Sequence, residues 1–149
     1  MLVLVDTNVL VRVIEPRHAH HAQAVAAIRA LSLAGNTLCL VPQVHCEFWV
    51  GATRPIAVNG LSMTSLEAEA ELLKLGPPLF RMLRDERAVY DRWRELVIKH
   101  RVQRKGAHDA RLVAAMYRHG LTHILTFNAA DFKRYPGITV LDPEQTVTA

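Results

Sequence analysis

The chain lacks both the long apolar segment of a membrane protein and the cysteine pattern of a disulfide-stabilised one. No apolar stretch reaches the roughly 18 residues that a membrane-spanning helix needs, so we expect no membrane partner. The N-terminus has no basic region and already carries Asp6, which argues against a secretory signal peptide. The two cysteines, Cys39 and Cys46, have no metal-binding spacing, and we expect free thiols in a reducing cytoplasm.

Several common catalytic motifs are missing as well. The sequence has no GxxxxGK[ST] or GxGxxG pattern for binding phosphates, and no GxSxG nucleophile elbow. The Asp-x-Asp pair of haloacid-dehalogenase-type phosphatases is also absent, because Thr7 and Asn8 follow Asp6. These absences argue against nucleotide-binding, hydrolase and phosphatase chemistry of those types.

The composition is that of an ordinary globular protein with an uneven charge. Half of the 149 residues are apolar and about a fifth are charged, so we expect one domain over residues 1–149 with a substantial core. The formal charge is +4, and residues 81–134 hold thirteen of the eighteen Lys and Arg but six of the fourteen acids. This asymmetry permits a polyanionic partner, although solvated basic helix faces would produce it too.

Short apolar runs alternate with helical patterns along the chain. This alternation predicts an α/β fold with a mainly parallel central sheet and helices on both faces. The expected strands are 2–5, 37–41, 122–126 and 138–141, with an extended piece at 79–83. The expected helices are 9–14, 17–34, 42–53, 64–75, 85–97 and 107–119, with Thr64–Glu67 as a capping box and Asp85 as an N-cap.

Carboxylates stand where these strands end. Asp6 follows the first strand, Glu47 the second and Asp131 the strand at 122–126, while Asp109 opens the helix before that strand. The carboxyl ends of parallel strands share one edge of a sheet, where ligands bind in open α/β folds. We therefore expect these four carboxylates to converge.

Three of these acids also have a local explanation. Asp6 has N-cap chemistry for the following helix, and Asp109 lies in a first turn, where the helix dipole stabilises an anion by about 0.3–1 kcal/mol. Glu47 fits either the solvent-facing side of its helix or a polar cleft beside Asp6. The residues alone leave these alternatives open.

Converging carboxylates repel one another, and a hard divalent cation would relieve the repulsion. An all-oxygen ligand set favours Mg²⁺ or Mn²⁺ over Zn²⁺, and such ions serve phosphodiester hydrolysis. The basic segment 101–106 leads into the helix of Asp109, and its Arg104 and Lys105 are candidate RNA phosphate contacts. A plain solvated loop is the alternative for this segment.

Four segments resemble the acidic motifs of PIN domains, in order and over nearly the whole chain, from Leu2 to about Pro143. They are Asp6-Thr7-Asn8-Val9-Leu10, Glu47-Phe48-Trp49, His108-Asp109-Ala110-Arg111-Leu112, and Leu125-Thr126-Phe127-Asn128-Ala129-Ala130-Asp131-Phe132. The size is similar to that of the VapC-type toxins of bacterial toxin–antitoxin pairs.

The resemblance implies a three-layer α/β/α fold and a Mg²⁺- or Mn²⁺-dependent endoribonuclease. It implies that Asp6 and Asp109 are the main metal ligands, that Glu47 holds metal or orients the attacking water, and that Asp131 completes the cluster. Some family members have the last acid nearer the position of Asn128, and we expect Asp131 to take the role in this chain. Hydrogen-bonding support is expected from Thr7, Asn8, Thr126 and Asn128.

The resemblance also implies partners, namely an RNA substrate, a second copy in a homodimer and a cognate antitoxin that covers the active site. An antitoxin Arg would suit an acidic pocket, and we expect the helices before Pro77 to provide the groove. Two alternatives remain at this point. One is a catalytically inactive PIN-like module that binds RNA or protein, and the other is a metal-dependent DNA nuclease or phosphatase.

Overall fold

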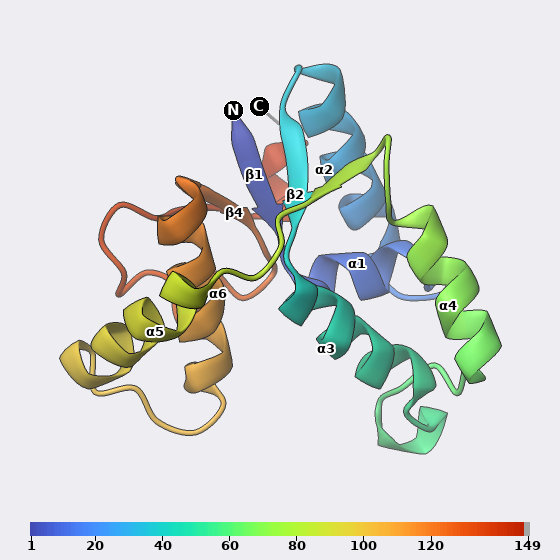
Figure 1. The fold of residues 1–149 in the computed structure, drawn as a ribbon. Coiled ribbons are helices and arrows are strands. Elements are labelled where there is room, and N and C mark those ends of the chain that lie inside the picture. Colours follow the sequence, from blue (N-terminus) through green and yellow to red (C-terminus); the bar gives the residue numbers. More distant parts are fainter. Residues whose placement is uncertain (148–149) are drawn as a thin grey trace.

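The computed structural model describes residues 1–147 and is built around a sheet of five parallel strands. The strands lie in the spatial order β3-β2-β1-β4-β5 (Figure 1). Their bounds are β1 Leu2–Val5, β2 Thr37–Leu40, β3 Phe80–Met82, β4 His123–Leu125 and β5 Thr139–Leu141. The central strand β1 pairs with β2 on one side, where Leu4 lies opposite Cys39, and with β4 on the other, where Leu4 lies opposite Ile124.

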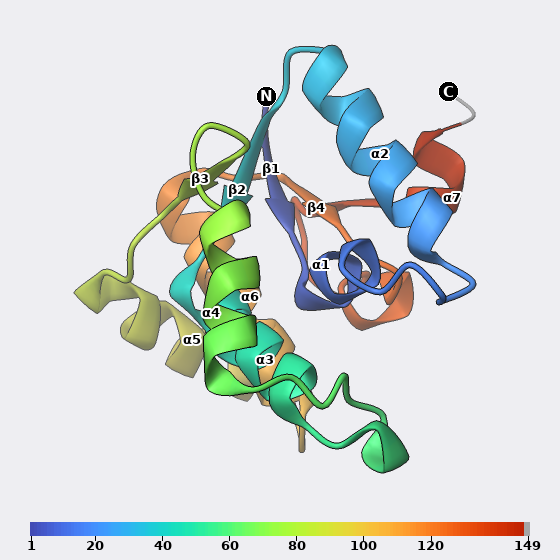
Figure 2. The ribbon, with the colours of Figure 1, turned by 90° about the vertical axis from the view of Figure 1, so that its right-hand side faces the viewer.

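Helices cover both faces of this sheet. The chain moves outward from β1 to β3, crosses back to β4 and continues to β5, so the direction of winding reverses beside β1. Helices α5 and α6 pack together on one face, while α1, α2 and α7 cover the other (Figures 1 and 2). The helices are α1 Thr7–Val13, α2 His21–Leu33, α3 Pro42–Thr53, α4 Ser65–Lys74, α5 Arg87–Lys99, α6 Gly106–His119 and α7 Pro143–Thr146, with 3₁₀ turns η1 Ile56–Val58 and η2 Ala129–Asp131. The predicted three-layer α/β/α arrangement is confirmed.

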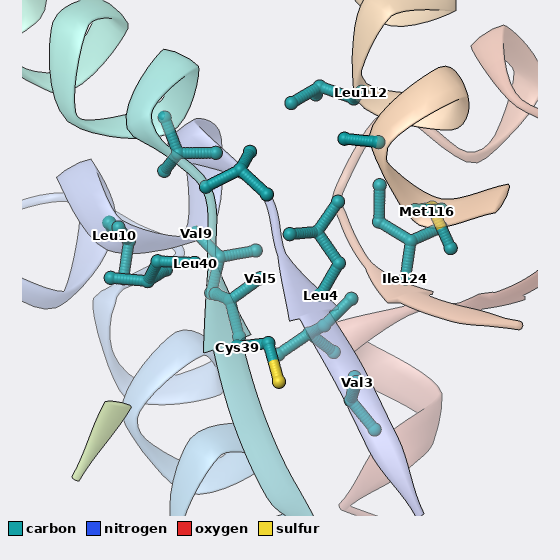
Figure 3. Packing of buried hydrophobic residues seen from close by; sticks show 14 of the residues in the cluster. Val3, Leu4, Val5, Val9, Leu10, Cys39, Leu40, Leu112, Met116 and Ile124 are labelled. Atoms are coloured by element: carbon teal, nitrogen blue, oxygen red, sulfur yellow. The ribbon is translucent and has the colours of Figure 1, made fainter. Parts of the chain in front are cut away.

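The apolar run before Asp6 is the centre of the core. Val3, Leu4 and Val5 are completely buried, as a strand covered on both faces requires. Figure 3 shows Val9 of α1 on one side of this strand and Met116 of α6 on the other. Burial of β1 on both sides fixes the place where the strand ends, and with it the position of Asp6.

Three helix starts differ from their predictions. Helix α1 begins at Thr7 rather than at residue 9, with Asp6 as its N-cap. Helix α2 begins at His21 rather than at residue 17, because the segment before it forms turns. Asp85 was expected to cap α5, but the N-cap is Glu86, without a side-chain capping bond, and Asp85 instead pairs with Arg111 at 3.3 Å. The capping box of α4 is present as predicted. Within residues 1–147, no helix combines the length and the apolarity that crossing a bilayer would require.

Candidate metal centre

The four predicted acids lie at or beyond the carboxyl edge of the sheet. Asp6 directly follows β1, Glu47 lies in the second turn of α3, Asp109 in the first turn of α6, and Asp131 ends η2. These elements meet where the winding of the sheet reverses beside β1, the place where open α/β sheets bind ligands. The charges of Glu47 and Asp131 raise the pKa of Asp6. The charges of Asp6, Glu47 and Asp131 in turn raise the pKa of Asp109. The fold therefore brings the four carboxylates within electrostatic reach of one another.

Asp6 is held by a closely fitted set of donors. Its side chain is 6% exposed, and its Oδ1 accepts a hydrogen bond from the Thr7 backbone N–H at 2.7 Å. Its Oδ2 accepts bonds from Asn8 Nδ2 at 3.0 Å and from Thr126 Oγ1 at 2.7 Å. Asp6 thus does cap α1, and the same bonds fix the direction in which its carboxylate faces the other acids.

The completely buried Thr126, which follows β4, connects the end of β4 to the end of β1. Besides donating to Asp6, its hydroxyl oxygen accepts from Asn8 Nδ2 at 3.0 Å and from the Asn128 backbone N–H at 3.0 Å. The Asn8 amide oxygen in turn accepts from the Phe127 N–H at 3.2 Å. Asn8 and Thr126 therefore orient Asp6, while Asn128 contributes through its backbone.

Glu47 lies beside Asp6 and not on the solvent-facing side of α3. Its Oε2 accepts a hydrogen bond from Thr7 Oγ1 at 2.8 Å, and its Oε1 accepts one from Gln43 Nε2 at 2.8 Å. Thr7 donates its backbone N–H to Asp6 and its hydroxyl to Glu47, so this one residue fixes the spacing of two carboxylates. Phe48, the next residue on α3, is completely buried, which sets the rotation of the helix.

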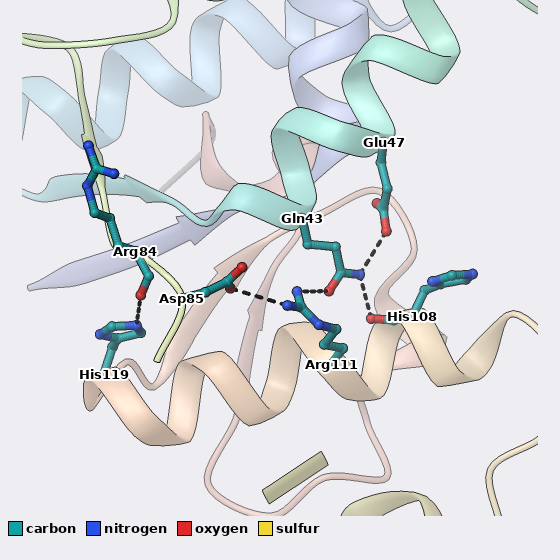
Figure 4. A network of polar contacts seen from close by, with 7 residues as sticks. All are labelled: Gln43, Glu47, Arg84, Asp85, His108, Arg111 and His119. Atoms are coloured by element: carbon teal, nitrogen blue, oxygen red, sulfur yellow. Dashed lines mark hydrogen bonds and ion pairs between the residues drawn. The ribbon is translucent and has the colours of Figure 1, made fainter. Parts of the chain in front are cut away.

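A polar network continues from Glu47, and its first member, Gln43, was not among the predicted site residues. Gln43 Nε2 also donates to the backbone oxygen of His108 at 2.8 Å, and its Oε1 accepts from Arg111 Nη1 at 3.2 Å. Arg111 Nη2 pairs with Asp85 Oδ1 (Figure 4). The spacing of four residues between Gln43 and Glu47 was the available signal, since it places both on one face of a helix.

Burial and mutual repulsion change the acidity of two of these groups. Loss of hydration on burial is the main cause that raises the pKa of Asp6 from 3.8 to about 6. The hydrogen bonds from Thr126 and Thr7 lower this pKa, and the repulsion of Glu47 and Asp131 raises it further. Burial is also the main cause that raises the pKa of Asp109 to about 7. The negative charges of Asp131, Asp6 and Glu47 raise it further, in that order of size. Without a cation, Asp109 is therefore partly protonated at neutral pH, and Asp6 becomes so at slightly acidic pH.

Asp131, rather than Asn128, carries the negative charge that reaches this centre from η2. It is exposed, and its charge is the largest electrostatic cause of the raised pKa of Asp109 after burial. The side chain of Asn128 makes no capping bond to η2, although Asn128 is its N-cap. The negative charge of Asp131 therefore acts on Asp109, the neighbouring acid of this centre.

The donor chemistry of this centre suits a hard divalent cation. All four groups offer carboxylate oxygens, and two of them have raised pKa values that a cation would lower. Among residues 1–147, no three His, Cys, Asp or Glu side chains already form a compact ligand group. Asp6 and Glu47 instead direct their oxygens toward protein donors. Asp6 Oδ1 and both oxygens of Glu47 accept one bond each and retain a further lone pair, whereas Asp6 Oδ2 already accepts two bonds. The residues fit Mg²⁺ or Mn²⁺ by type and by charge.

Basic side chains border the acidic centre at the start of α6. Lys105 is the N-cap residue of α6, and its charge acts on Asp109, lowering its pKa. Arg104 precedes it with a left-handed backbone (φ 55°), and both side chains are exposed. A phosphate bound near Asp109 would therefore have cations close by.

The profile of the PIN domain family matches residues 3–138 of the chain. A comparison of the chain with curated protein sequences found no match. Among solved structures, VapBC2 of Rickettsia felis bound to a promoter DNA fragment is similar with a TM-score of 0.69 and 14% identity, over 95% of this chain and 98% of that chain. A toxin–antitoxin complex of Klebsiella pneumoniae is similar with a TM-score of 0.66 and 21% identity, over 95% of this chain and 97% of that chain. VapC20 of Mycobacterium tuberculosis, a toxin that cleaves the sarcin–ricin loop, is similar with a TM-score of 0.61 and 18% identity, over 82% of this chain and 86% of that chain. At such identities, the structures show a common fold.

Proposed function

Since the chain belongs to the PIN domain family, we propose that it is a Mg²⁺- or Mn²⁺-dependent endoribonuclease and the toxin of a toxin–antitoxin pair. The observation that carries this proposal is the convergence of Asp6, Glu47, Asp109 and Asp131 at the reversal point of the sheet. The similarity in fold to toxin–antitoxin proteins supports the biological role. The free thiols of Cys39 and Cys46 fit a cytoplasmic location.

We assign all four acids to the cation and give Glu47 and Asp6 one further role each in the proposed reaction. Asp6, Asp109, Asp131 and Glu47 would hold the cation, which when bound polarises a phosphoryl oxygen and acidifies water. Glu47 is held by Thr7 and Gln43, and its remaining lone pairs are available to orient an attacking water. Asp6 is buried and fully oriented, so its part is to anchor the centre rather than to move.

RNA would approach this centre along the start of α6. Lys105 and Arg104 are exposed next to Asp109, and the surrounding segment 81–134 carries most of the positive charge of the chain. Cations at that position would neutralise the phosphates that flank the scissile bond. Their role is binding, since the acids carry the chemistry.

We further propose an antitoxin and a second copy of the chain as protein partners. Large apolar side chains are exposed along α3, η1 and α4, and such surfaces often mark protein contacts; they are Val50, Ile56, Val58, Leu66 and Leu73. Antitoxin binding should therefore slow amide exchange within residues 42–75, and unchanged exchange there would contradict this placement. Sedimentation of the free protein tests the homodimer.

The experiment for the proposed activity compares matched RNA and DNA oligonucleotides and a structured RNA such as total tRNA. Purified, antitoxin-free protein is assayed with Mg²⁺, with Mn²⁺ and with EDTA. We expect cleavage of RNA that depends on the added metal. Metal-dependent cleavage of DNA alone would support the DNA-nuclease alternative. Metal binding without any cleavage would favour the binding module, and cleavage in EDTA would contradict the metal role.

A further inference from the structure

Gln43 is a buried polar residue in the first turn of α3, 8% exposed, and it faces the acidic centre. It lies four residues before Glu47, so the two side chains share one face of the helix. Burying an amide is costly unless its donors and acceptor find partners. The partners of Gln43 therefore explain why this side chain is at this position.

The orientation of the Gln43 amide is fixed by what surrounds it. Glu47 Oε1 and the backbone oxygen of His108 are acceptors only, so the two N–H groups of Nε2 point to them at 2.8 Å each. Arg111 is a donor only, so its Nη1 bonds to the Gln43 amide oxygen at 3.2 Å. A rotated amide would lose all three bonds, and the arrangement is unambiguous (Figure 4).

We propose that Gln43 is a positioning residue that locks the Glu47 carboxylate to the start of α6, where Asp109 lies. This inference rests on the proposed function, because it concerns how that acidic centre keeps its shape. Helices α3 and α6 come from different parts of the sheet and diverge below its carboxyl edge in Figure 1. The bond from Gln43 to the His108 carbonyl joins them one residue before Asp109.

The lock matters because Glu47 and Asp109 repel each other. A glutamate side chain has several rotatable bonds, and an unrestrained Glu47 would turn away from the other acids. Thr7 holds one of its oxygens from the side of β1, and Gln43 holds the other from the side of α6. Together they keep Glu47 where a cation can reach it.

Arg111 and Asp85 support the Gln43 side chain indirectly, and the effect of Asp85 is expected to be the smaller. Arg111 holds the amide oxygen of Gln43, and Asp85 holds Arg111 at 3.3 Å. Their side chains are 38% and 48% exposed, so water can replace part of each contact. The expected order of effect is therefore Gln43, then Arg111, then Asp85.

The test measures Mn²⁺ affinity of the RNA-free protein by electron paramagnetic resonance, beside cleavage kinetics and melting temperature. Gln43→Met keeps the length of the side chain and removes both donors. We expect its Mn²⁺ dissociation constant to rise about tenfold to a hundredfold, as for other residues that orient metal ligands. kcat should fall while the KM for RNA stays unchanged. Gln23→Met is the matched control, because the Gln23 amide oxygen is buried without a hydrogen-bond partner.

A double-mutant cycle separates positioning from simple packing. If Gln43 acts through Glu47, then Gln43→Met should change Mn²⁺ affinity little in a Glu47→Gln background. An equal loss in both backgrounds would overturn the proposal, and so would wild-type affinity in Gln43→Met. Should Gln43→Met not fold, Arg111→Met decides instead. It should weaken Mn²⁺ binding by a few-fold, and unchanged binding would overturn the lock.

Failure of this inference is distinguishable from failure of the proposed function. Wild-type protein that binds Mn²⁺ and cleaves RNA, beside an indistinguishable Gln43→Met, overturns the inference alone. Wild-type protein that neither binds Mn²⁺ nor cleaves RNA overturns both. Weakened binding by Gln43→Met, with Gln23→Met like the wild type, supports the inference.

Discussion

The chain contains two groups of acids, and only one of them has the properties of a site. On α4, Glu67 completes the capping box with Thr64, Glu71 pairs with Lys74 at 3.0 Å, and Glu69 is exposed. Each of these glutamates has solvent or a local partner. At the carboxyl edge of the sheet, by contrast, the acids come from four separate elements and repel one another.

The difference lies in topology and not in composition. The α4 acids stand within five residues, whereas Asp6 and Thr126, which bond directly, are 120 residues apart. A helix surface lets carboxylates spread into water, while the reversal point of a sheet forces them together in a partly buried place. Stored repulsion at one edge is what a cation would relieve.

The largest expected effect contrasts Asp109→Asn with Glu69→Gln. Loss of a cation ligand removes several kcal/mol of charge stabilisation, so Asp109→Asn should lower Mg²⁺-dependent RNA cleavage by at least about a hundredfold. Glu69→Gln removes the same charge from the exposed α4 group and should cleave like the wild type. Initial rates of both variants, with melting curves to verify folding, check the contrast. Equal rates for the two variants would erase the distinction between the groups.

The next contrast compares two threonines that bond to acids. Thr126→Val removes one of the two donors to Asp6 Oδ2 and the acceptor of the Asn128 N–H, which costs about 1–3 kcal/mol and weakens metal binding. Thr64→Ala removes the α4 cap, costs about 1 kcal/mol and leaves metal binding intact. Urea unfolding and Mn²⁺ titration measure both effects. Undiminished Mn²⁺ affinity in Thr126→Val would show that Asp6 needs no such support.

The pH dependence of metal-free stability provides a third contrast. The folded pKa values of Asp6 and Asp109, about 6 and about 7, exceed the ordinary value of 3.8, so the folded state binds more protons between those limits. Their contribution to the free energy of unfolding is therefore fully present below pH 4 and is lost as pH rises to about 7. In EDTA, Asp109→Asn should gain stability over the wild type as pH rises, and added Mg²⁺ should reverse this order.

Urea titrations of wild type and Asp109→Asn at pH 5 and pH 8 are sufficient for this comparison. A stability difference that does not change with pH would show that Asp109 titrates as an ordinary exposed carboxyl.

The smallest expected effect concerns the basic border of the acidic edge. Replacing Arg104 and Lys105 by Ala should reduce the slope of log affinity for single-stranded RNA against log salt by about 1.4, or 0.7 for each lost phosphate contact. The matched control replaces Arg29 and Lys74, on α2 and α4, and removes the same charge elsewhere. Equal slopes for both double variants would assign the effect to net charge rather than to this border.

Local sequence signals were enough to predict the layers and the candidate acids. The buried run that ends at Asp6 is visible as consecutive apolar letters, and the parallel sheet follows from its alternation with helices. Membership of the PIN domain family is likewise confirmed. The roles of the individual acids remain proposals.

Contacts between distant segments were what the sequence hid. The side of α3 on which Glu47 lies was undecided, because packing of Phe48 sets the rotation of the helix. Gln43 was missed because its second partner, the carbonyl of His108, is 65 residues away. Asp85 was taken for a cap because it precedes a helix, while its partner Arg111 lies on another one. Such pairings are settled by tertiary packing and leave no local trace.

The central claim is that a bound cation relieves the repulsion among the acids at the carboxyl edge of the sheet. The number of protons released when Mn²⁺ binds is its most direct test. Calorimetric titrations in two buffers of different ionisation enthalpy give this number at pH 6 and at pH 8.5. With pKa values of about 6 and about 7 for Asp6 and Asp109, we expect release of roughly one to one and a half protons at pH 6, falling toward zero at pH 8.5. Absence of Mn²⁺ binding, or binding at pH 6 without proton release, would contradict it.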